Sequence, residues 1–510
     1  MPTATGQCSN DEMQGRLTGG QPRETDMSDT PKPAYPRIGL LIDGEWIYDR
    51  PTLCDVENPS DESIIGQVPK ATAEDLQNAL ASSARAFDVW RRTPPSERSA
   101  VMKRAAALIR ERASMIAPIF TMELGKTIAE SLAEIERSAT FLDWDSEELR
   151  RLYGRIVPTD PPIQQFVVRE PIGPVAAFTP WNVPMSAPSR KVSASLAAGC
   201  SVILKPAEET PATACLFAQC FIDAGLPKGV LNVVFGDPDE VSHTLVLSPI
   251  TRLVTLTGSI HVGKHLTRLA AETMKPVLME LGGHAPVLID ENVDVDGVAQ
   301  MAVNWKFRMA GQFCSAPSRF LIHRSVYGDF VESLASKASK LKVGDGFEEG
   351  VQMGPLANRR RLAAMADLVE DAVSNGARIA TGGQRVGNRG WFYAPTVLAD
   401  VPLEARIMSE EPFGPIAPCA SVDSMDEALE ISNSLEMGLA AFVFTNSMQR
   451  ADHLARELQV GSVALNVFTS PGADAPFGGY RESGIGREGG PEMYHSYTVA
   501  KTIAERRIAV

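Results

Sequence analysis

Residues 174–206 read PVAAFTPWNVPMSAPSRKVSASLAAGCSVILKP and contain two short apolar runs with a helix-like stretch between them. The runs PVAAFT and SVILKP have the length of buried strands, and residues 187–198 between them have the periodicity of a helix. A strand, a crossover helix and a second strand form one unit of a parallel sheet. This stretch therefore predicts an α/β fold.

The same alternation continues along the chain. Further strands are predicted at LNVVFG and RLVTLTG, with helices over 211–224, 238–247 and 261–273. A second set has strands at APVLID, RFLIH, AAFVFT and SVALN, one helix ending near 309, and helices over 325–339 and 358–374. Regular alternation is typical of doubly wound parallel sheets. We expect two α/β lobes that meet in a cleft.

The two ends of the chain differ from this pattern. Residues 1–36 are polar and acidic without an apolar segment, which indicates a disordered tail, and Met27 is a candidate for the natural start. Thr72 and Asp75 have the spacing of a capping box before an amphipathic helix. The C-terminal YTVAKTIAERRIAV is strand-like and apolar, so we expect it to pair with another subunit.

The composition is that of a globular protein and excludes several functions. Of the 510 residues 44% are hydrophobic and 22% are charged, and the net charge is −14, which argues against a nucleic-acid surface. No apolar run is long enough to span a membrane. The seven cysteines include no CxxC pair, which favours free thiols in a reducing, cytoplasmic environment.

Six short motifs lie between the predicted lobes and together resemble the aldehyde dehydrogenase superfamily. They are FTPWNVP (178–184), KPAEETP (205–211), LTGSIHVGK (256–264), MELGGHAP (279–286), GQFCSAPSR (311–319) and EEPFGP (410–415). The resemblance runs from about residue 37 to the C-terminus and includes PFGGYRESGIGREGG (476–490). Within the superfamily the chain is most similar to succinate-semialdehyde and α-ketoglutarate-semialdehyde dehydrogenases.

This resemblance implies a domain organisation as well as a fold. It implies a Rossmann-type NAD-binding domain (37–148 and 171–282), an α/β catalytic domain (283–482) and a small β oligomerisation element (149–170 and 483–510). It also implies a homodimer or homotetramer.

Cys314 in GQFCSAPSR is the candidate nucleophile. A free thiol has a pKa of about 8.5, so a catalytic cysteine needs a neighbouring base or favourable dipoles. The resemblance implies that Cys314 attacks the aldehyde to give a thiohemiacetal and then a thioester, that Asn182 helps to hold the oxyanion, and that Glu280 is the general base. Lys191 and Glu488 match a proton relay. The other cysteines are expected to be structural, His284 is peripheral, and no metal site is implied.

Cofactor binding is predicted at the start of the helix in TGSIHVG. Gly258 and Gly263 open this helix beside Ser259, where free N–H groups and the helix dipole suit a pyrophosphate. The resemblance implies that Lys205 and Glu208 bind the adenosine ribose. Because a carboxylate repels a 2′-phosphate, Glu208 predicts NAD as cofactor, with NADP as the weaker alternative. The remaining implied contacts are with Thr179, Trp181, Glu411 and Phe413.

The substrate is predicted from two arginines near catalytic positions. Arg190 and Arg308 match the residues that bind the distal carboxylate in semialdehyde dehydrogenases, and a buried guanidinium without its carboxylate costs about 2 to 5 kcal/mol. Both arginines could instead be solvated or structural. Phe313 adds an aromatic wall, which leaves open a dehydrogenase of aromatic or other neutral aldehydes. A third alternative is a cofactor-binding structural protein without turnover, but retention of Cys314, Glu280 and Asn182 disfavours it.

Overall fold

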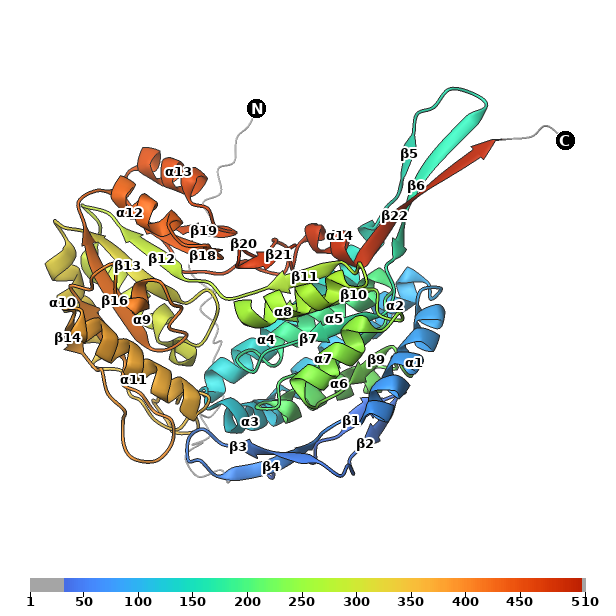
Figure 1. Cartoon of the computed structure of the whole chain (residues 1–510), viewed down its shortest axis with the longest axis horizontal. Coiled ribbons are helices and arrows are strands. Elements are labelled where there is room, and N and C mark those ends of the chain that lie inside the picture. The colour runs from blue at the N-terminus through green and yellow to red at the C-terminus, as the bar shows by residue number, and fades with distance from the viewer. Residues whose placement is uncertain (1–31, 507–510) are drawn as a thin grey trace, which may run out of the picture.

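The computed structural model describes residues 32–506 and contains two large sheets, each with its own hydrophobic core (Figure 1). The first sheet has the strand order β2-β1-β9-β8-β7-β10-β11-β21. Its strands are β1 (Leu40–Ile42), β2 (Glu45–Ile47), β7 (Val175–Phe178), β8 (Val202–Lys205), β9 (Leu231–Val233), β10 (Leu253–Thr257), β11 (Val277–Glu280) and β21 (Gly484–Ile485). The five central strands, β9 to β11 in this order, are parallel.

Eight α-helices lie in the same part of the described chain, between residues 73 and 271. They are α1 (Ala73–Trp90), α2 (Pro95–Glu111), α3 (Ala113–Leu124), α4 (Ile128–Glu148), α5 (Ser186–Ala198), α6 (Pro211–Asp223), α7 (Pro238–Leu247) and α8 (Ile260–Ala271). The predicted capping box is confirmed, because Thr72 accepts from the Asp75 N–H and the Asp75 carboxylate accepts from the Thr72 N–H. The α/β fold predicted from residues 174–206 is also confirmed, since β7, α5 and β8 form that unit.

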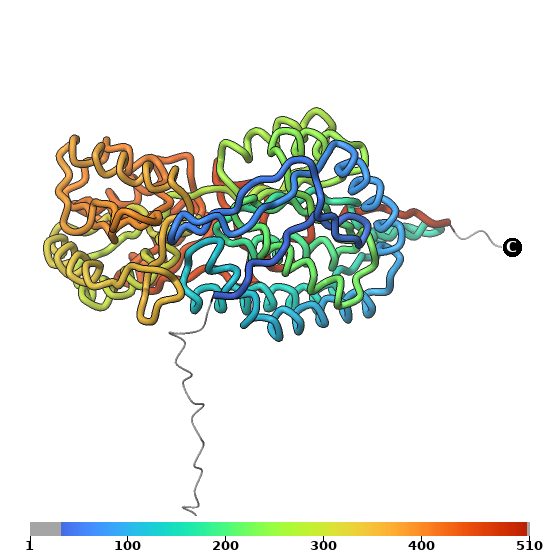
Figure 2. The backbone as a smooth tube through the Cα atoms, turned by 90° about the horizontal axis from the view of Figure 1, so that it is seen from below, coloured from blue at the N-terminus to red at the C-terminus, as the bar shows by residue number. Residues whose placement is uncertain are grey.

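The second sheet has the strand order β14-β15-β16-β13-β12-β18-β19. Its strands are β12 (Ala285–Ile289), β13 (Pro317–His323), β14 (Arg378–Thr381), β15 (Thr396–Ala399), β16 (Ile416–Val422), β18 (Ala440–Phe444) and β19 (Ser462–Leu465). The helices in this part are α9 (Val295–Lys306), α10 (Tyr327–Ala338), α11 (Arg359–Ser374), α12 (Met425–Asn433) and α13 (Met448–Glu457). In Figure 2 these yellow and orange residues gather at one end of the molecule.

A three-stranded arm projects away from the first sheet (Figure 1). It consists of β5 (Arg155–Val157), β6 (Ile163–Pro171) and β22 (Thr498–Arg506), in the order β22-β6-β5. The C-terminal strand pairs over its whole length with β6 of the same chain and lies at the edge of this sheet, so its expected pairing with another subunit stays a prediction. Smaller elements are the pairs β3 (Leu53–Glu57) with β4 (Ile64–Pro69) and β17 (Met437–Gly438) with β20 (Tyr480–Arg481), and the short helix α14 (Tyr494–Tyr497).

Two expectations were wrong in detail. Residues 32–36 were assigned to a disordered tail, but Lys32 forms an ion pair with Asp345 at 2.7 Å and the Tyr35 hydroxyl donates to Glu123. Met27 lies outside the described residues. The helix expected to end near 309 ends at Lys306, because the following turn places Met309 and Ala310 at φ +52°, where a right-handed helix cannot continue. No helix among residues 32–506 is long and apolar enough to cross a membrane.

Candidate active site

The parallel strands of the first sheet bring four predicted site positions to one edge. Thr179 directly follows β7, Lys205 ends β8, Gly258 directly follows β10, and Glu280 ends β11. Thr257 pairs with Glu280, and Phe178 pairs with both Lys205 and Leu256. The strand order also reverses between β7 and β10, which is the place where open α/β sheets bind ligands. The topology therefore collects the motifs at one crevice.

Cys314 and Glu280 are neighbours in this crevice. Burial and the nearby Glu280 raise the pKa of the Cys314 thiol well above its ordinary value. Burial, reinforced by the charge of Glu488, raises the pKa of Glu280 to about 8, and its Oε1 atom is buried without a hydrogen-bond partner among residues 32–506. The free structure therefore holds a neutral thiol beside a carboxyl group that titrates near neutral pH, which is the range a general base requires.

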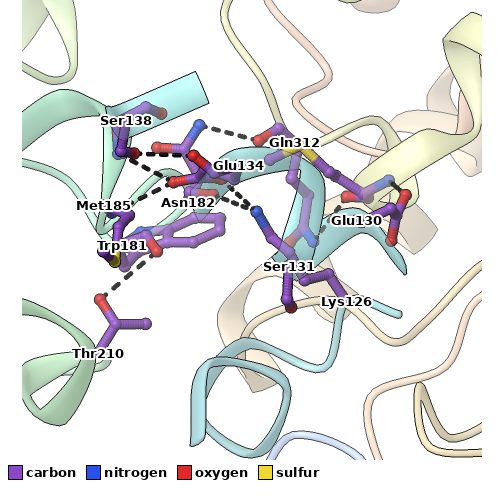
Figure 3. A network of polar contacts seen from close by, with 12 residues as sticks. Lys126, Glu130, Ser131, Glu134, Ser138, Trp181, Asn182, Met185, Thr210 and Gln312 are labelled. Atoms are coloured by element: carbon purple, nitrogen blue, oxygen red, sulfur yellow. Dashed lines mark hydrogen bonds and ion pairs between the residues drawn. The ribbon is translucent and has the colours of Figure 1, made fainter. Parts of the chain in front are cut away.

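Asn182 is fixed from two sides (Figure 3). Its side-chain Nδ2 donates to the backbone carbonyl of Gln312 at 2.9 Å, and its own carbonyl lies 3.4 Å from Lys126 Nζ. Gln312 is two residues before Cys314, so this contact directs the Asn182 amide toward the nucleophile. Because an amide nitrogen has two N–H groups, one remains for a substrate oxygen.

A buried network of hydrogen bonds behind Asn182 was not predicted from the sequence. Lys126 donates to Glu134 Oε2 at 2.6 Å, and Glu134 Oε1 accepts from the N–H groups of Met185 and Ser186 at 3.2 and 3.1 Å. The Gln312 side chain accepts from Ala357 N at 2.9 Å. Charged residues such as Lys126 and Glu134 usually lie on the surface of a protein. Only their burial in the structure reveals that they support Asn182.

Lys191 and Glu488, predicted as a relay, form a buried ion pair. The Lys191 side chain is fully buried and Glu488 is 3% exposed. Lys191 lowers and Glu488 raises the pKa of Glu280. Their charges therefore act on the base position, and the structure brings the three residues together as the resemblance implied.

Arg190 and Arg308 lie against aromatic rings. The Arg308 guanidinium is 3.7 Å from the Trp305 ring centroid and 4.5 Å from that of Phe313. The Arg190 guanidinium is 4.0 Å from the Phe141 centroid. In the described part of the chain neither arginine forms an ion pair within 4 Å, and Arg190 Nη1 and Arg308 Nε are buried without hydrogen-bond partners. Burial lowers the pKa of Arg308 to about 10.

On the predicted adenosine side of the crevice, Lys205 and Glu208 form a hydrogen-bonded ion pair. Lys205 Nζ donates to Glu208 Oε2 at 2.7 Å, and Glu208 Oε1 accepts from the Gly236 N–H at 3.2 Å. Ser259 is the N-cap of α8, and its side chain accepts from the Val262 N–H. Glu208 is thus fixed at the carboxyl end of β8, at the same edge as the start of α8.

The predicted nicotinamide side is formed by residues 411–413. Burial raises the pKa of Glu411 to about 8. A Cβ atom at Gly282 would lie 2.4 Å from Glu411 Oε2, so a larger residue there would displace the Glu411 carboxylate. The rings of Trp181 and Phe413 meet edge to face with centroids 5.7 Å apart.

Two basic residues that sequence reasoning missed stand behind this segment. Arg361 Nη2 donates to the carbonyls of Pro412 and Phe413, the latter at 3.1 Å. Lys306 is fully buried, and burial lowers its pKa to about 7 while the charge of Glu411 opposes that shift. Both basic groups can therefore stabilise the position or the charge of the 411–413 segment.

The residues fit a nicotinamide dinucleotide. Thr179 Oγ1 is a buried polar atom without a partner among the described residues, and it lies directly after β7 where a ligand would approach. The capped N-terminus of α8 suits a phosphate. The Trp181 and Phe413 rings provide an apolar surface for a flat ring.

His284 and the remaining cysteines take no part in this arrangement. The ring nitrogens of His284 contact Ser318 Oγ at 2.8 Å and the Ile407 carbonyl at 3.0 Å, which fixes the histidine in the second core. The four cysteines at 200, 215, 220 and 419 are buried, and Cys54 is half-buried. Burial raises the pKa of all five thiols. Cys8 lies outside the described residues.

The chain is similar to known proteins over most of its length. The model of the aldehyde dehydrogenase family matches residues 46–503. A putative 4-(hydroxymethyl)benzenesulfonate dehydrogenase of Comamonas testosteroni is 43% identical over 91% of this chain and 97% of its own length. The NADP⁺ succinate-semialdehyde dehydrogenase of Escherichia coli is 37% identical over 91% and 97%. The crystal structure of a betaine aldehyde dehydrogenase from Staphylococcus aureus in complex with NAD⁺ matches with a TM-score of 0.90 at 32% identity, covering 92% of this chain and 95% of the other.

Proposed function

The chain belongs to the aldehyde dehydrogenase family, and we propose that it uses NAD to oxidise an aldehyde with an anionic group at its far end, such as succinate or α-ketoglutarate semialdehyde, to the acid. The observation that carries this proposal is the pair of half-buried arginines, Arg190 and Arg308, each with a buried side-chain nitrogen without a hydrogen bond and neither with a carboxylate partner within 4 Å in the described residues. A guanidinium of this kind favours an anionic ligand.

The chemistry begins at Cys314. Its Sγ forms a bond to the aldehyde carbon while the thiol proton passes to Glu280, and the aldehyde oxygen becomes an oxyanion. The Asn182 amide and the Cys314 N–H donate to that oxyanion, and one such donor contributes roughly 10²- to 10³-fold in rate. Bound NAD supplies the acceptor for the hydride.

The second half of the reaction releases the acid. After hydride loss the acyl group is a thioester on Cys314. Glu280 then takes a proton from water, the water oxygen bonds to the acyl carbon, and the C–S bond breaks to return the sulfur as thiolate or thiol. The raised pKa of Glu280 suits both proton transfers, because the group both accepts and gives up a proton near neutral pH. Lys191 and Glu488 carry the proton onward from Glu280.

The choice of NAD rests on Glu208. Its carboxylate is held by Lys205 and by the Gly236 N–H at the carboxyl end of β8. A fixed carboxylate can accept hydrogen bonds from ribose hydroxyls but repels a 2′-phosphate. This arrangement supports NAD over NADP.

A second candidate is an aromatic or other neutral aldehyde as substrate. Trp305 and Phe313 meet edge to face with centroids 6.2 Å apart, directly before the nucleophile, and form an aromatic wall there. The aromatic substrate named for the Comamonas relative favours the same candidate. Against a fully neutral substrate stand the two guanidinium groups described above.

We also propose that the β5-β6-β22 arm joins subunits into a homodimer or homotetramer. The arm projects from the body of the molecule (Figure 1), and several of its exposed side chains are apolar, interspersed with polar and charged ones. Ile156 is 74% exposed, and Ile163, Val499 and Ile503 are exposed as well. Apolar side chains on a projecting sheet are typical of a surface that a partner covers.

The experiment compares kcat/KM for succinate semialdehyde with that for butyraldehyde, its neutral four-carbon analogue, by following NADH formation. A ratio above about 100, or about 2.7 kcal/mol of transition-state discrimination, supports recognition of the anionic group. A ratio near one rejects it and leaves the neutral or aromatic aldehydes.

A further inference from the structure

A third arginine, Arg137, lies on the face of α4 that borders the crevice. Residues three and four apart on a helix share a face, so Arg137 lies between Glu134 and Phe141. Glu134, Phe141 and also Glu130, which lies one turn before Glu134, all contact segments of the candidate site. Glu130 accepts from Met309 N at 2.7 Å, Glu134 accepts from the Met185 and Ser186 N–H groups, and the Phe141 ring contacts Arg190.

Arg137 is therefore placed near both predicted substrate arginines. Glu130 reaches the residue after Arg308, and Phe141 lies under Arg190, with Arg137 between these two contacts along the helix. Electrostatics agree with this placement. Burial lowers the pKa of both Arg190 and Arg308, and the positive charge of Arg137 lowers each further.

The carboxylates closest along the helix are already engaged. Glu130 accepts from the N–H and hydroxyl of Thr127 in a capping box, in addition to Met309 N. Glu134 pairs with Lys126. Among residues 32–506, Arg137 forms no ion pair within 4 Å, and its side chain is exposed. None of the three arginines thus has a salt-bridge partner within 4 Å among residues 32–506, and the charge of Arg137 acts on both of the others.

The buried N–H groups of two tryptophans are further hydrogen-bond donors without a partner among the described residues. Trp144 lines a small cavity with Arg190, and Trp305 lies against Arg308. The Nε1 atoms of both tryptophans are buried without hydrogen-bond partners in the described residues, as are Arg190 Nη1 and Arg308 Nε. Buried polar groups are almost always paired in proteins. All four of these atoms are donors, so each of the two sites favours an acceptor such as an oxyanion, and the Asp145 carboxylate also lines the cavity of Trp144 and Arg190.

The surroundings of these donors are aromatic. Arg308 contacts the rings of Trp305 and Phe313, and Arg190 lies over Phe141 with the Phe477 centroid at 5.7 Å. Flat, apolar walls suit a ring, and guanidinium groups suit an oxyanion. An unbranched semialdehyde would use the arginines but leave the rings without a matching surface.

We propose that the substrate is an aromatic aldehyde with a sulfonate or carboxylate on its ring, and that Arg137 is a specificity-determining residue for that anionic group. This inference rests on the proposed function, because it requires the same crevice to recognise an anion. Arg137 acts from the solvent side, where it attracts the anion and neutralises part of its charge, while Arg190 and Arg308 bind from within. The aromatic sulfonate named for the Comamonas relative supports the same substrate class.

The experiment compares 4-formylbenzenesulfonate, 4-formylbenzoate and benzaldehyde as substrates of the wild type, Arg137→Gln and Arg137→Lys. Lys340→Gln is the control, because it removes one exposed positive charge after α10, a helix that contributes no residue to the candidate site. We expect Arg137→Gln to lower kcat/KM about fivefold for the two anionic aldehydes, the effect of one partly solvated charge pair. The loss should lie mainly in KM, shrink at high salt and be largely restored in Arg137→Lys. Benzaldehyde should change less than about twofold, as should all three substrates with Lys340→Gln.

Each contrary result has its own meaning. If the wild type prefers succinate semialdehyde over butyraldehyde but does not prefer the anionic aromatic aldehydes over benzaldehyde, the aromatic inference fails and the proposed function stands. If the wild type discriminates in neither pair, both fail. Equal losses for all three aldehydes in Arg137→Gln, or no loss for any, would show that Arg137 does not determine specificity. A larger effect with the sulfonate or with the benzoate identifies which oxyanion the site prefers.

Discussion

Lys126 and Glu134 form a buried ion pair, with 2.6 Å between Nζ and Oε2, behind the candidate oxyanion donor Asn182. Their side chains are 1% and 5% exposed. The other carboxylate oxygen of Glu134 binds the backbone at the start of α5, so the pair connects α4 to the segment that presents Asn182.

Glu134→Gln should therefore impair both stability and catalysis. Removing one partner of a buried pair leaves an uncompensated charge and costs about 3 to 5 kcal/mol. We expect a lower free energy of unfolding in urea and a kcat reduced about tenfold through displacement of Asn182. Glu147→Gln is the control on the same helix, because the exposed Lys103–Glu147 pair should contribute less than about 1 kcal/mol. If both variants behave alike, the pair has no part in the site.

Cys314→Ala should abolish NADH formation while leaving NAD binding measurable. The thiol is the only group proposed to bond to the substrate, whereas the cofactor contacts come from other strands. Isothermal titration with NAD and steady-state assays with the preferred aldehyde measure the two effects separately. Cys54→Ala, at a half-buried cysteine outside the crevice, is the control. Turnover that survives in Cys314→Ala would point to another nucleophile.

The activity should rise with pH as Glu280 ionises. Its pKa is raised to about 8, so the wild-type kcat/KM should increase up to about pH 8, and Glu280→Gln should lose this limb together with most of the activity. The raised pKa also favours folding with the proton bound. That stabilisation is complete below the ordinary pKa of about 4.5 and is lost as pH rises through about 8.

Glu280→Gln should consequently gain stability relative to the wild type at pH 9 more than at pH 6. Urea unfolding at the two pH values tests this sign. A wild-type advantage that grows with pH would contradict the buried environment assigned to Glu280.

Arg308→Leu should separate recognition of the anion from chemistry. We expect KM for succinate semialdehyde to rise about 30-fold or more, in line with about 2 kcal/mol or more for an unpaired anionic group. Butyraldehyde should be nearly unaffected. Arg308→Lys keeps the charge but not the planar fork, so it should recover part of the loss. Equal losses for both aldehydes would indicate that Arg308 is structural.

Glu208→Thr should shift the cofactor preference toward NADP. Removing the carboxylate relieves repulsion of a 2′-phosphate and leaves Lys205 free to attract it. We expect the ratio of kcat/KM with NADP to that with NAD to rise at least about tenfold, or about 1.4 kcal/mol. The Tm of the variant serves as the control for the lost contact with the Gly236 N–H. An unchanged ratio would show that Glu208 does not select the cofactor.

The parts of the fold that the sequence predicted are those with local signals. The capping box of Thr72 and Asp75 and the strands around α5 lie where periodicity and spacing placed them. The end of α9 was predicted wrongly. Met309 and Ala310 lie in a left-handed turn, a conformation that non-glycine residues rarely adopt and that the sequence does not indicate. That turn is stabilised by Glu130 from a distant helix, which no local pattern indicates.

Strand pairings between distant parts of the chain could not be predicted from the sequence either. The β6–β22 pairing joins residues more than 300 positions apart, so an apolar C-terminal strand gave no indication of its partner. The candidate site was predicted through its motifs, but Lys126, Glu134 and Arg361 belong to none of them. Their importance follows from burial and from the backbone groups they bind. The bounds of the three domains remain a prediction.

The close approach of Gly311 to Gly414 has a consequence for redesign of this protein. A Cβ atom at Gly311 would lie 2.2 Å from the Gly414 carbonyl oxygen, so the loop before the nucleophile and the loop after Phe413 touch backbone to backbone. A displacement of either loop must therefore move the other. A designer who wants a new aldehyde should leave residues 309–311 intact and reshape the aromatic walls at Phe141 and Trp305, which contact the substrate arginines and are not among the proposed cofactor contacts.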